Sequence, residues 1–256
     1  MPGRILAVAV NTFRETIRNK ILYAILAFAL LVIGLSWFLA DLSVGDLARI
    51  IADVGLACIH LFGVIMAVFL GITLVSHEVD RKTVYLILAR PVARWEFVVG
   101  KAAGLSGTLL LTTLVMAATL FLVHAGYGQA PEVGILVASA GIYMELVLLT
   151  CLASFFSSFT TPVLSAMFTL SMFLIGHVSK DLLVFGGRAA SGAIRAVSSL
   201  LFYLLPNLEN FNWKNEVVYG GARSPALIPL AAGYLLAYCA AVMILACLIF
   251  SRKDFK

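Results

Sequence analysis

Six long runs of apolar residues, separated by shorter polar segments, set the pattern of this chain. A helix needs about 20 mostly apolar residues to cross a bilayer, within a range of about 17 to 25. The expected spans are 21–40, 54–76, 102–123, 133–156, 162–178 and 226–250. The sequence therefore predicts an all-α polytopic membrane protein with six transmembrane helices, in which residues 1–256 form a single transmembrane domain.

Residues 2–20 have a different, two-faced spacing of apolar positions. One helical face carries Ile5, Ala9, Phe13 and Ile17, and another carries Arg4, Asn11, Glu15 and Arg18. Such a helix lies in a membrane interface, with its basic side chains toward anionic lipid. We expect an N-terminal amphipathic interfacial helix with membrane lipid as a partner. The alternative is a basic flank that only orients the first span.

Composition and charge exclude a soluble or nucleic-acid-binding protein. Hydrophobic residues make up 62% of the chain and charged residues 12%, whereas soluble domains have about 45–50% and about 25%. The net charge is +5, and 12 of the 18 basic residues fall on one side of the expected spans. Because basic residues concentrate in cytoplasmic segments of membrane proteins, both termini are predicted to be cytoplasmic, and no nucleic-acid partner is expected.

The segment 77–101, between spans 2 and 3, is the densest charged stretch of the chain. It still contains the apolar residues Val84, Leu86 and Leu88, and Pro91 interrupts any helix there, because the residue before a proline avoids the helical region. We predict a compact cytoplasmic helical elbow whose apolar side chains are covered by the membrane or by another protein.

The segment 180–224, between spans 5 and 6, contains a second amphipathic pattern. Ile194, Val197, Leu201 and Leu204 share one helical face, and Pro206 ends the pattern. The uncharged run 196–205 is too short to cross a bilayer. We expect an outer re-entrant or interfacial helix followed by a polar loop; a broken extra span is the alternative.

Short motifs in the elbow resemble the signature of ABC-type-2 transporter permeases, the membrane subunits of ATP-binding-cassette exporters. The matching positions are Glu78, Lys82-Thr83 (where Gly-Thr is commoner), Pro91-Val92-Ala93-Arg94 and Gly100-Lys101. The end of the chain, from Phe250 to Phe255, is also similar to the cytoplasmic end of that family. The stretch Pro206–Phe211 resembles the branch related to the copper-enzyme maturation permease NosY.

The resemblance implies a permease subunit in the bacterial inner membrane that works as a homodimer. Each copy would rest on a separate cytoplasmic ABC ATPase, which binds ATP and Mg. The elbow would be the coupling helix that docks on this ATPase, through Glu78, Lys82, Thr83, Arg90, Pro91 and Arg94. An accessory protein on the periplasmic or extracellular side is a further expected partner. The chain itself has no GxxxxGK[ST] phosphate-binding loop, so this chain is expected to bind no cofactor and to be no enzyme.

Polar residues inside the spans are the candidates for a translocation path. Glu145 lies at the centre of span 4, where a lone carboxylate is a functional candidate, although a structural hydrogen bond is the other interpretation. His60 lies six residues from the outer end of span 2, where it either faces substrate or packs as a neutral side chain. Since spans 2 and 5 line the path in the resembling family, Met66, Thr73 and Met172 are further candidates. No metal site is predicted.

Two other classes of membrane protein remain as alternatives. A secondary transporter or channel would need no ATPase, but such proteins are usually built from internal repeats, and none is evident. An intramembrane serine protease is suggested by Gly104-Leu105-Ser106-Gly107. Its only candidate base on a later span is His177, which the expected spans place about a bilayer away from Ser106.

Overall fold

The computed structural model describes residues 2–41, 47–80, 93–126, 133–188, 192–214 and 227–252, and these residues form helices and their connections without a strand. In chain order the helices are α1 (Pro2–Ile17), α2 (Lys20–Asp41), α3 (Leu47–Asp80), α5 (Arg94–Gly126), α6 (Val133–Ser157), α7 (Pro162–Arg188), α8 (Gly192–Leu204), the 3-10 helix η1 (Leu208–Phe211) and α10 (Leu227–Arg252). The predicted all-α class is confirmed.

The apolar runs fold as long helices, as the sequence predicts. Five helices among the described residues contain segments long and apolar enough to cross a membrane alone: Ala48–Ile72, Trp95–Gly126, Val133–Ser157, Pro162–Asp181 and Ile228–Ile249. The sixth is formed if α1 and α2, which meet at an angle of 63°, are counted as one bent pair. The bend lies where α1 ends and Asn19 accepts a hydrogen bond from the backbone N–H of Ile21 (2.9 Å).

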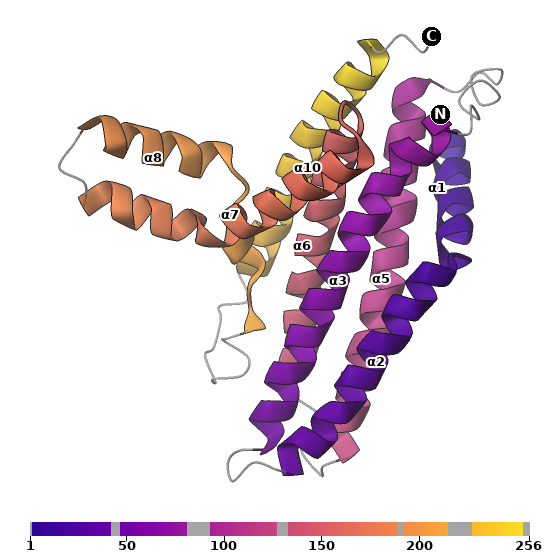
Figure 1. The fold of residues 1–256 in the computed structure, drawn as a ribbon, viewed down its shortest axis with the longest axis vertical. Coiled ribbons are helices and arrows are strands. Elements are labelled where there is room, and N and C mark those ends of the chain that lie inside the picture. The colour runs from indigo at the N-terminus through magenta and orange to yellow at the C-terminus, as the bar shows by residue number, and fades with distance from the viewer. Residues whose placement is uncertain are drawn as a thin grey trace.

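The helix α3 packs against α2, α5 and α6, and the core of the bundle lies between these helices (Figure 1). Glycines on α3 permit the close approach. A side chain at Gly63 would overlap Leu146 of α6, and one at Gly71 would overlap Ala153. Small residues let helices in a membrane approach closely and gain van der Waals contact, because burial from water contributes little there.

The N-terminal helix α1 lies along the first half of α5, beside the bundle (Figure 1). A Cβ atom at Gly104 would lie 2.5 Å from the carbonyl oxygen of Ala9 and 2.8 Å from Cβ of Thr12, and one at Gly100 would lie 2.8 Å from Cβ of Val8. The predicted two-faced helix therefore forms. Its polar face is exposed, and its other side packs on α5, which the sequence did not predict.

The helices α7 and α8 form an antiparallel hairpin that projects sideways from the bundle (Figure 1). No residue of α8 is buried, and its apolar side chains Ile194, Val197 and Leu200 are exposed. The chain then returns to the bundle through η1, which packs against α6 and α7. The start of α1 and the end of α10 lie at the same end of the molecule (Figure 1), as expected for an even number of spans.

Candidate functional site

Three bundle helices each bring one titratable side chain to a common point. His60 comes from α3, Glu145 from α6 and His177 from α7. The Oε1 atom of Glu145 lies 2.9 Å from Nε2 of His60 and 3.6 Å from Nε2 of His177. Glu145 is 1% exposed, and the histidine side chains are 12% and 22% exposed. The structure thus brings together two predicted site residues, His60 and Glu145, and adds His177.

His60 lies deeper than the sequence predicts. The predicted span began at residue 54, because Arg49 and Asp53 are charged, but the helix and its apolar segment begin earlier, at Leu47 and Ala48. Both charged side chains are exposed, so the helix includes them without burying them. His60 therefore lies at the middle of Ala48–Ile72, level with the middle of α6, and the expected position near the outer end of the span is wrong.

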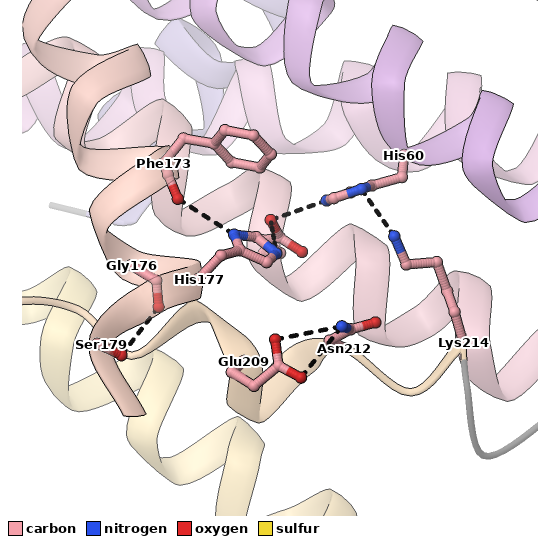
Figure 2. A network of polar contacts seen from close by, with 9 residues as sticks. His60, Phe173, Gly176, His177, Ser179, Glu209, Asn212 and Lys214 are labelled. Atoms are coloured by element: carbon pink, nitrogen blue, oxygen red, sulfur yellow. Dashed lines mark hydrogen bonds and ion pairs between the residues drawn. The ribbon is translucent and has the colours of Figure 1, made fainter. Parts of the chain in front are cut away.

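A fourth titratable side chain, Lys214, joins the cluster from outside the spans. Nζ of Lys214 lies 2.8 Å from Nδ1 of His60 (Figure 2). An ammonium can only donate, so Nδ1 of His60 accepts, and the proton of the neutral ring is on Nε2, which donates to Glu145. On the other side, Nδ1 of His177 donates to the carbonyl oxygen of Phe173 at 3.1 Å (Figure 2). These tautomers are assigned from the bonding partners.

The contacts explain how a carboxylate can lie inside the bundle. A charged Asp, Lys or Arg at the centre of a membrane helix costs about 3 kcal/mol on insertion scales. The charge-assisted hydrogen bond from His60 to Glu145 offsets such a cost. Lys214 donates a hydrogen bond to the other ring nitrogen of His60 and so holds the ring in this orientation. Burial lowers the pKa of Lys214, and the negative charges of Glu145, Glu209 and Asp53 act in the opposite direction.

Lys214 reaches the cluster because the segment Pro206–Lys214 is folded into the bundle. Leu208, Phe211 and Trp213 are buried. The backbone N–H of Asn207 donates to the Tyr234 hydroxyl of α10 (2.9 Å). Two glycines make room for the loop, because neither has a side chain. A Cβ atom at Gly141 would lie 2.5 Å from the carbonyl oxygen of Phe211, and one at Gly176 would lie 2.7 Å from Leu208.

Within this loop, Trp213 and Asn212 donate side-chain hydrogen bonds, whereas Oδ1 of Asn207 and Oδ1 of Asn212 are buried without a partner. Nε1 of Trp213 donates to the carbonyl oxygen of Asn210 (2.8 Å), and the amide of Asn212 donates to the carboxylate of Glu209 (3.2 Å; Figure 2). The sequence predicts the amphipathic helix before this loop but not the burial of the loop. Lys214 is not among the predicted site residues, and His177 is predicted only as the base of a protease site. The available signal was that spans 2, 4 and 5 each carry a single side chain of the Asp, Glu, Lys, Arg or His type, which needs a partner inside a membrane.

The remaining path candidates do not join the cluster. Met66 is fully buried in the α3 core, and Met172 on α7 is half-buried against it. The side chain of Thr73 lies outside the described residues.

The predicted coupling elbow lies at the other end of α3. Lys82, Thr83, Arg90 and Pro91 lie outside the described residues, as do the side chains of Glu78 and Arg94. The exit from the elbow is described. The buried carboxylate of Glu96 accepts a hydrogen bond from the backbone N–H of Ala93 (3.1 Å). This is the reciprocal half of a capping box, in which the third residue of a helix bonds the residue before its start. The start of α5 is thus fixed by its own sequence.

The cluster does not have the geometry of a serine protease. Ser106 donates to the carbonyl oxygen of Ala102 (2.9 Å) and lines an apolar groove of about 830 Å³ between α5 and α10. The expected separation of Ser106 and His177 by a bilayer is wrong. Both contact α6 within three residues, Ser106 through Tyr143 (3.4 Å) and His177 through Glu145. Within the described chain, α6 lies between serine and histidine, so no bond activates the serine.

Comparison with known proteins places the chain in a family. None of the curated proteins compared matches it. The family model described as ABC-2 family transporter protein matches residues 6–255, from the second turn of α1 almost to the end of the printed sequence. The bent α1–α2 pair, the five further long apolar helices and the cluster between α3, α6 and α7 all fall within this match. The chain therefore belongs to the ABC-2 family of transporter proteins, as a multi-pass membrane protein.

Proposed function

We propose that this chain is the permease subunit of an ABC transporter and couples ATP hydrolysis by a separate cytoplasmic ATPase to export, or to mechanical work, across the membrane. The family match over residues 6–255 carries this proposal. The sequence agrees with it, because the chain has no phosphate-binding loop of the GxxxxGK[ST] type and would need a partner to use ATP.

The packing of α1 on α5 supports a mechanical role for the elbow. The elbow joins α3 to α5, and Glu96 fixes the first turn of α5. Gly100 and Gly104, one and two turns further on, hold α1 in backbone contact. A force applied to the elbow by an ATPase would therefore move α5 and α1 together. A switch of this kind requires two discrete arrangements that the nucleotide state favours differently.

Topology and assembly follow from the same proposal. The start of α1 and the end of α10 face the cytoplasm, because 12 of the 18 basic residues fall in the sequence segments on that side of the expected spans. Two copies and two ATPases form the complex in a bacterial inner membrane. The exposed apolar side of the α7–α8 hairpin, including Ile194 and Leu200, would face lipid or the second copy. The resemblance of Pro206–Phe211 to the NosY-related branch supports membership of that branch as part of the proposal.

Co-purification tests the proposal. The chain is expressed with its neighbouring reading frames, extracted in mild detergent and captured through an affinity tag. We expect a soluble partner with a phosphate-binding loop at one copy per chain, and its ATPase activity should change when the permease is present. If the chain purifies alone and transports in an ion gradient without ATP, it is a secondary transporter and the proposal fails.

Charge reversal at Arg94 tests the elbow as the docking site. Arg94→Glu should reduce the yield of the ATPase complex several-fold while membrane insertion is unchanged. The matched control is Arg188→Glu, which reverses an exposed charge at the end of α7, away from the elbow. Equal complex yield and equal ATPase stimulation in the two variants would contradict docking at the elbow.

A further inference from the structure

The cluster of His60, Glu145 and His177 has an unsatisfied contact at its centre. Nε2 of His177 is buried, has no hydrogen-bond partner and lies 3.6 Å from Oε1 of Glu145. Because Nδ1 of His177 donates to the carbonyl oxygen of Phe173, the Nε2 atom of the neutral ring carries a lone pair. A lone pair therefore faces a carboxylate oxygen, and two acceptors at this distance repel each other unless a cation lies between them.

The three side chains form a donor set that binds transition metals. Two imidazole nitrogens and one carboxylate oxygen, with a fourth position open, are the ligands of one class of zinc site. With metal–ligand bonds of about 2.0–2.1 Å, tetrahedral geometry separates two ligand atoms by about 3.3 Å. The observed separations from Oε1 of Glu145, 2.9 and 3.6 Å, lie on either side of this value, and all three ligand atoms lie within 4.8 Å of one another.

The surroundings of the cluster also suit an ion. Ligating histidines usually donate their second ring nitrogen to a carbonyl or carboxylate, which orients the ring, and His177 donates to Phe173 in this way. Both histidine side chains are partly exposed, whereas Glu145 is buried. An ion at Nε2 of His60 would displace the proton that this atom now donates to Glu145, and that proton would leave to solvent. The ring would stay neutral because the Lys214 ammonium would pass one proton to Nδ1 and then accept the hydrogen bond as a neutral amine. The ammonium of Lys214 is the one opposing charge that contacts the ligands among the described residues.

We infer that His60, Glu145 and His177 bind one divalent transition-metal ion of the Zn²⁺ class, which ties α7 to the α3–α6 pair. The inference is independent of the energy source of the transporter, because it concerns residues of this chain alone. The ion would add a second polar attachment of α7 to the bundle, beside the hydrogen bond that Ser165 of α7 donates to the carbonyl oxygen of Ala153 of α6 (3.1 Å). The competing explanation is a second proton on His177, which would make an ion pair with Glu145 and leave no room for a metal.

Metal titration of the purified chain tests this inference. The protein carries a tag without histidines, is extracted in detergent and is freed of metal by chelation and dialysis. Zn²⁺ is then titrated by calorimetry, and Co²⁺ is added as a spectroscopic probe. We expect one Zn²⁺ per chain and a visible Co²⁺ spectrum typical of nitrogen and oxygen ligands in four-coordinate geometry, which Zn²⁺ abolishes.

Three variants separate this site from adventitious binding. Loss of an outer-shell partner already weakens metal binding about 10–100-fold, so Glu145→Gln and His177→Gln should each weaken it by at least 100-fold. His124→Gln is the matched control, because His124 is a buried histidine of α5 outside the cluster, and its affinity should equal that of the wild type. The wild-type titration needs no variant to fold: no stoichiometric Zn²⁺ binding overturns the inference. Equal affinity in Glu145→Gln, or an equal loss in His124→Gln, also overturns it.

Discussion

The contact between α1 and α5 depends on the absence of a side chain at Gly104. A Cβ atom there would lie 2.5 Å from the carbonyl oxygen of Ala9 and 2.8 Å from Cβ of Thr12, both of which belong to the core of α1 rather than to a flexible side-chain end. Gly104→Ala should therefore push the two helices apart. Gly34→Ala is the matched control, since Gly34 also lies within a helix, α2, and has no atom within 4 Å of the added Cβ.

The size of the effect follows from two opposing contributions. Replacing glycine by alanine inside a helix stabilises it by about 0.5–1 kcal/mol, and this gain is common to both variants. Ordinary contact for a Cβ begins at 3.4 Å, so Gly104→Ala demands a shift of nearly an ångström in two backbones. Overpacking of this kind costs about 1–3 kcal/mol. Gly104→Ala should thus be less stable than Gly34→Ala by about 1–3 kcal/mol.

Thermal unfolding in detergent measures the difference. At about 2–4 °C per kcal/mol for a chain of this size, Gly104→Ala should melt about 2–12 °C below Gly34→Ala. Trypsin gives a local measurement, because Arg14 and Arg18 are exposed near the end of α1: cleavage there should be faster in Gly104→Ala only. Equal melting temperatures and equal cleavage rates would show that α1 does not pack on α5 through Gly104.

Two further predictions concern the buried loop Pro206–Lys214. Lys214→Met removes the donor to His60 and leaves a buried acceptor unpaired, so it should lower the free energy of unfolding by about 1–3 kcal/mol. Lys180→Met, at an exposed lysine of α7, should have little effect in the same melting assay. Equal melting temperatures of the two variants would contradict the bond between Lys214 and His60. Gly141→Ala should displace Phe211 and Trp213 and shift the tryptophan fluorescence to longer wavelength. Gly233→Ala, whose added Cβ meets no atom within 4 Å, should leave the spectrum unchanged. Identical spectra of the two variants would show that the loop does not pack on α6 at Gly141.

The sequence predicts the helices of this protein well because the membrane restricts what an apolar run can do. Backbone polar groups in lipid must be satisfied within the segment, so a run of about 20 apolar residues becomes a helix. The limits of the helices are less predictable. The helix α3 begins before Asp53 rather than after it, since an exposed charge at a helix end costs little. That difference moves His60 from the predicted outer end to the middle of the bundle.

The candidate site is less predictable because its members are far apart in sequence. His60 and Glu145 are separated by 85 residues, and His60 and Lys214 by 154. Helical periodicity relates residues within a few turns only, so it places Glu145 on a face of α6 without naming its partner. The loop that carries Lys214 reads as polar and therefore as exposed. Its burial depends on Gly141 and Gly176, which have no side chain to block the loop. They can receive the loop only after α6 and α7 have packed in the bundle.

The position of the cluster has a mechanical consequence for an ABC-2 protein. The helix α3 runs without a break from His60 to Asp80, at the edge of the elbow. A helix transmits displacement along its axis because each turn is held by backbone hydrogen bonds. Any movement of the elbow end of α3 therefore reaches His60, whose bonds to Glu145 and Lys214 leave it little freedom to absorb a shift. The network between α3, α6, α7 and the buried loop must then either break or carry α7 and its hairpin along. If an ATPase docks at the elbow as proposed, a substitution at Glu145 that frees α7 should alter the coupling of ATP hydrolysis to work, although 20 residues of α3 separate His60 from Asp80.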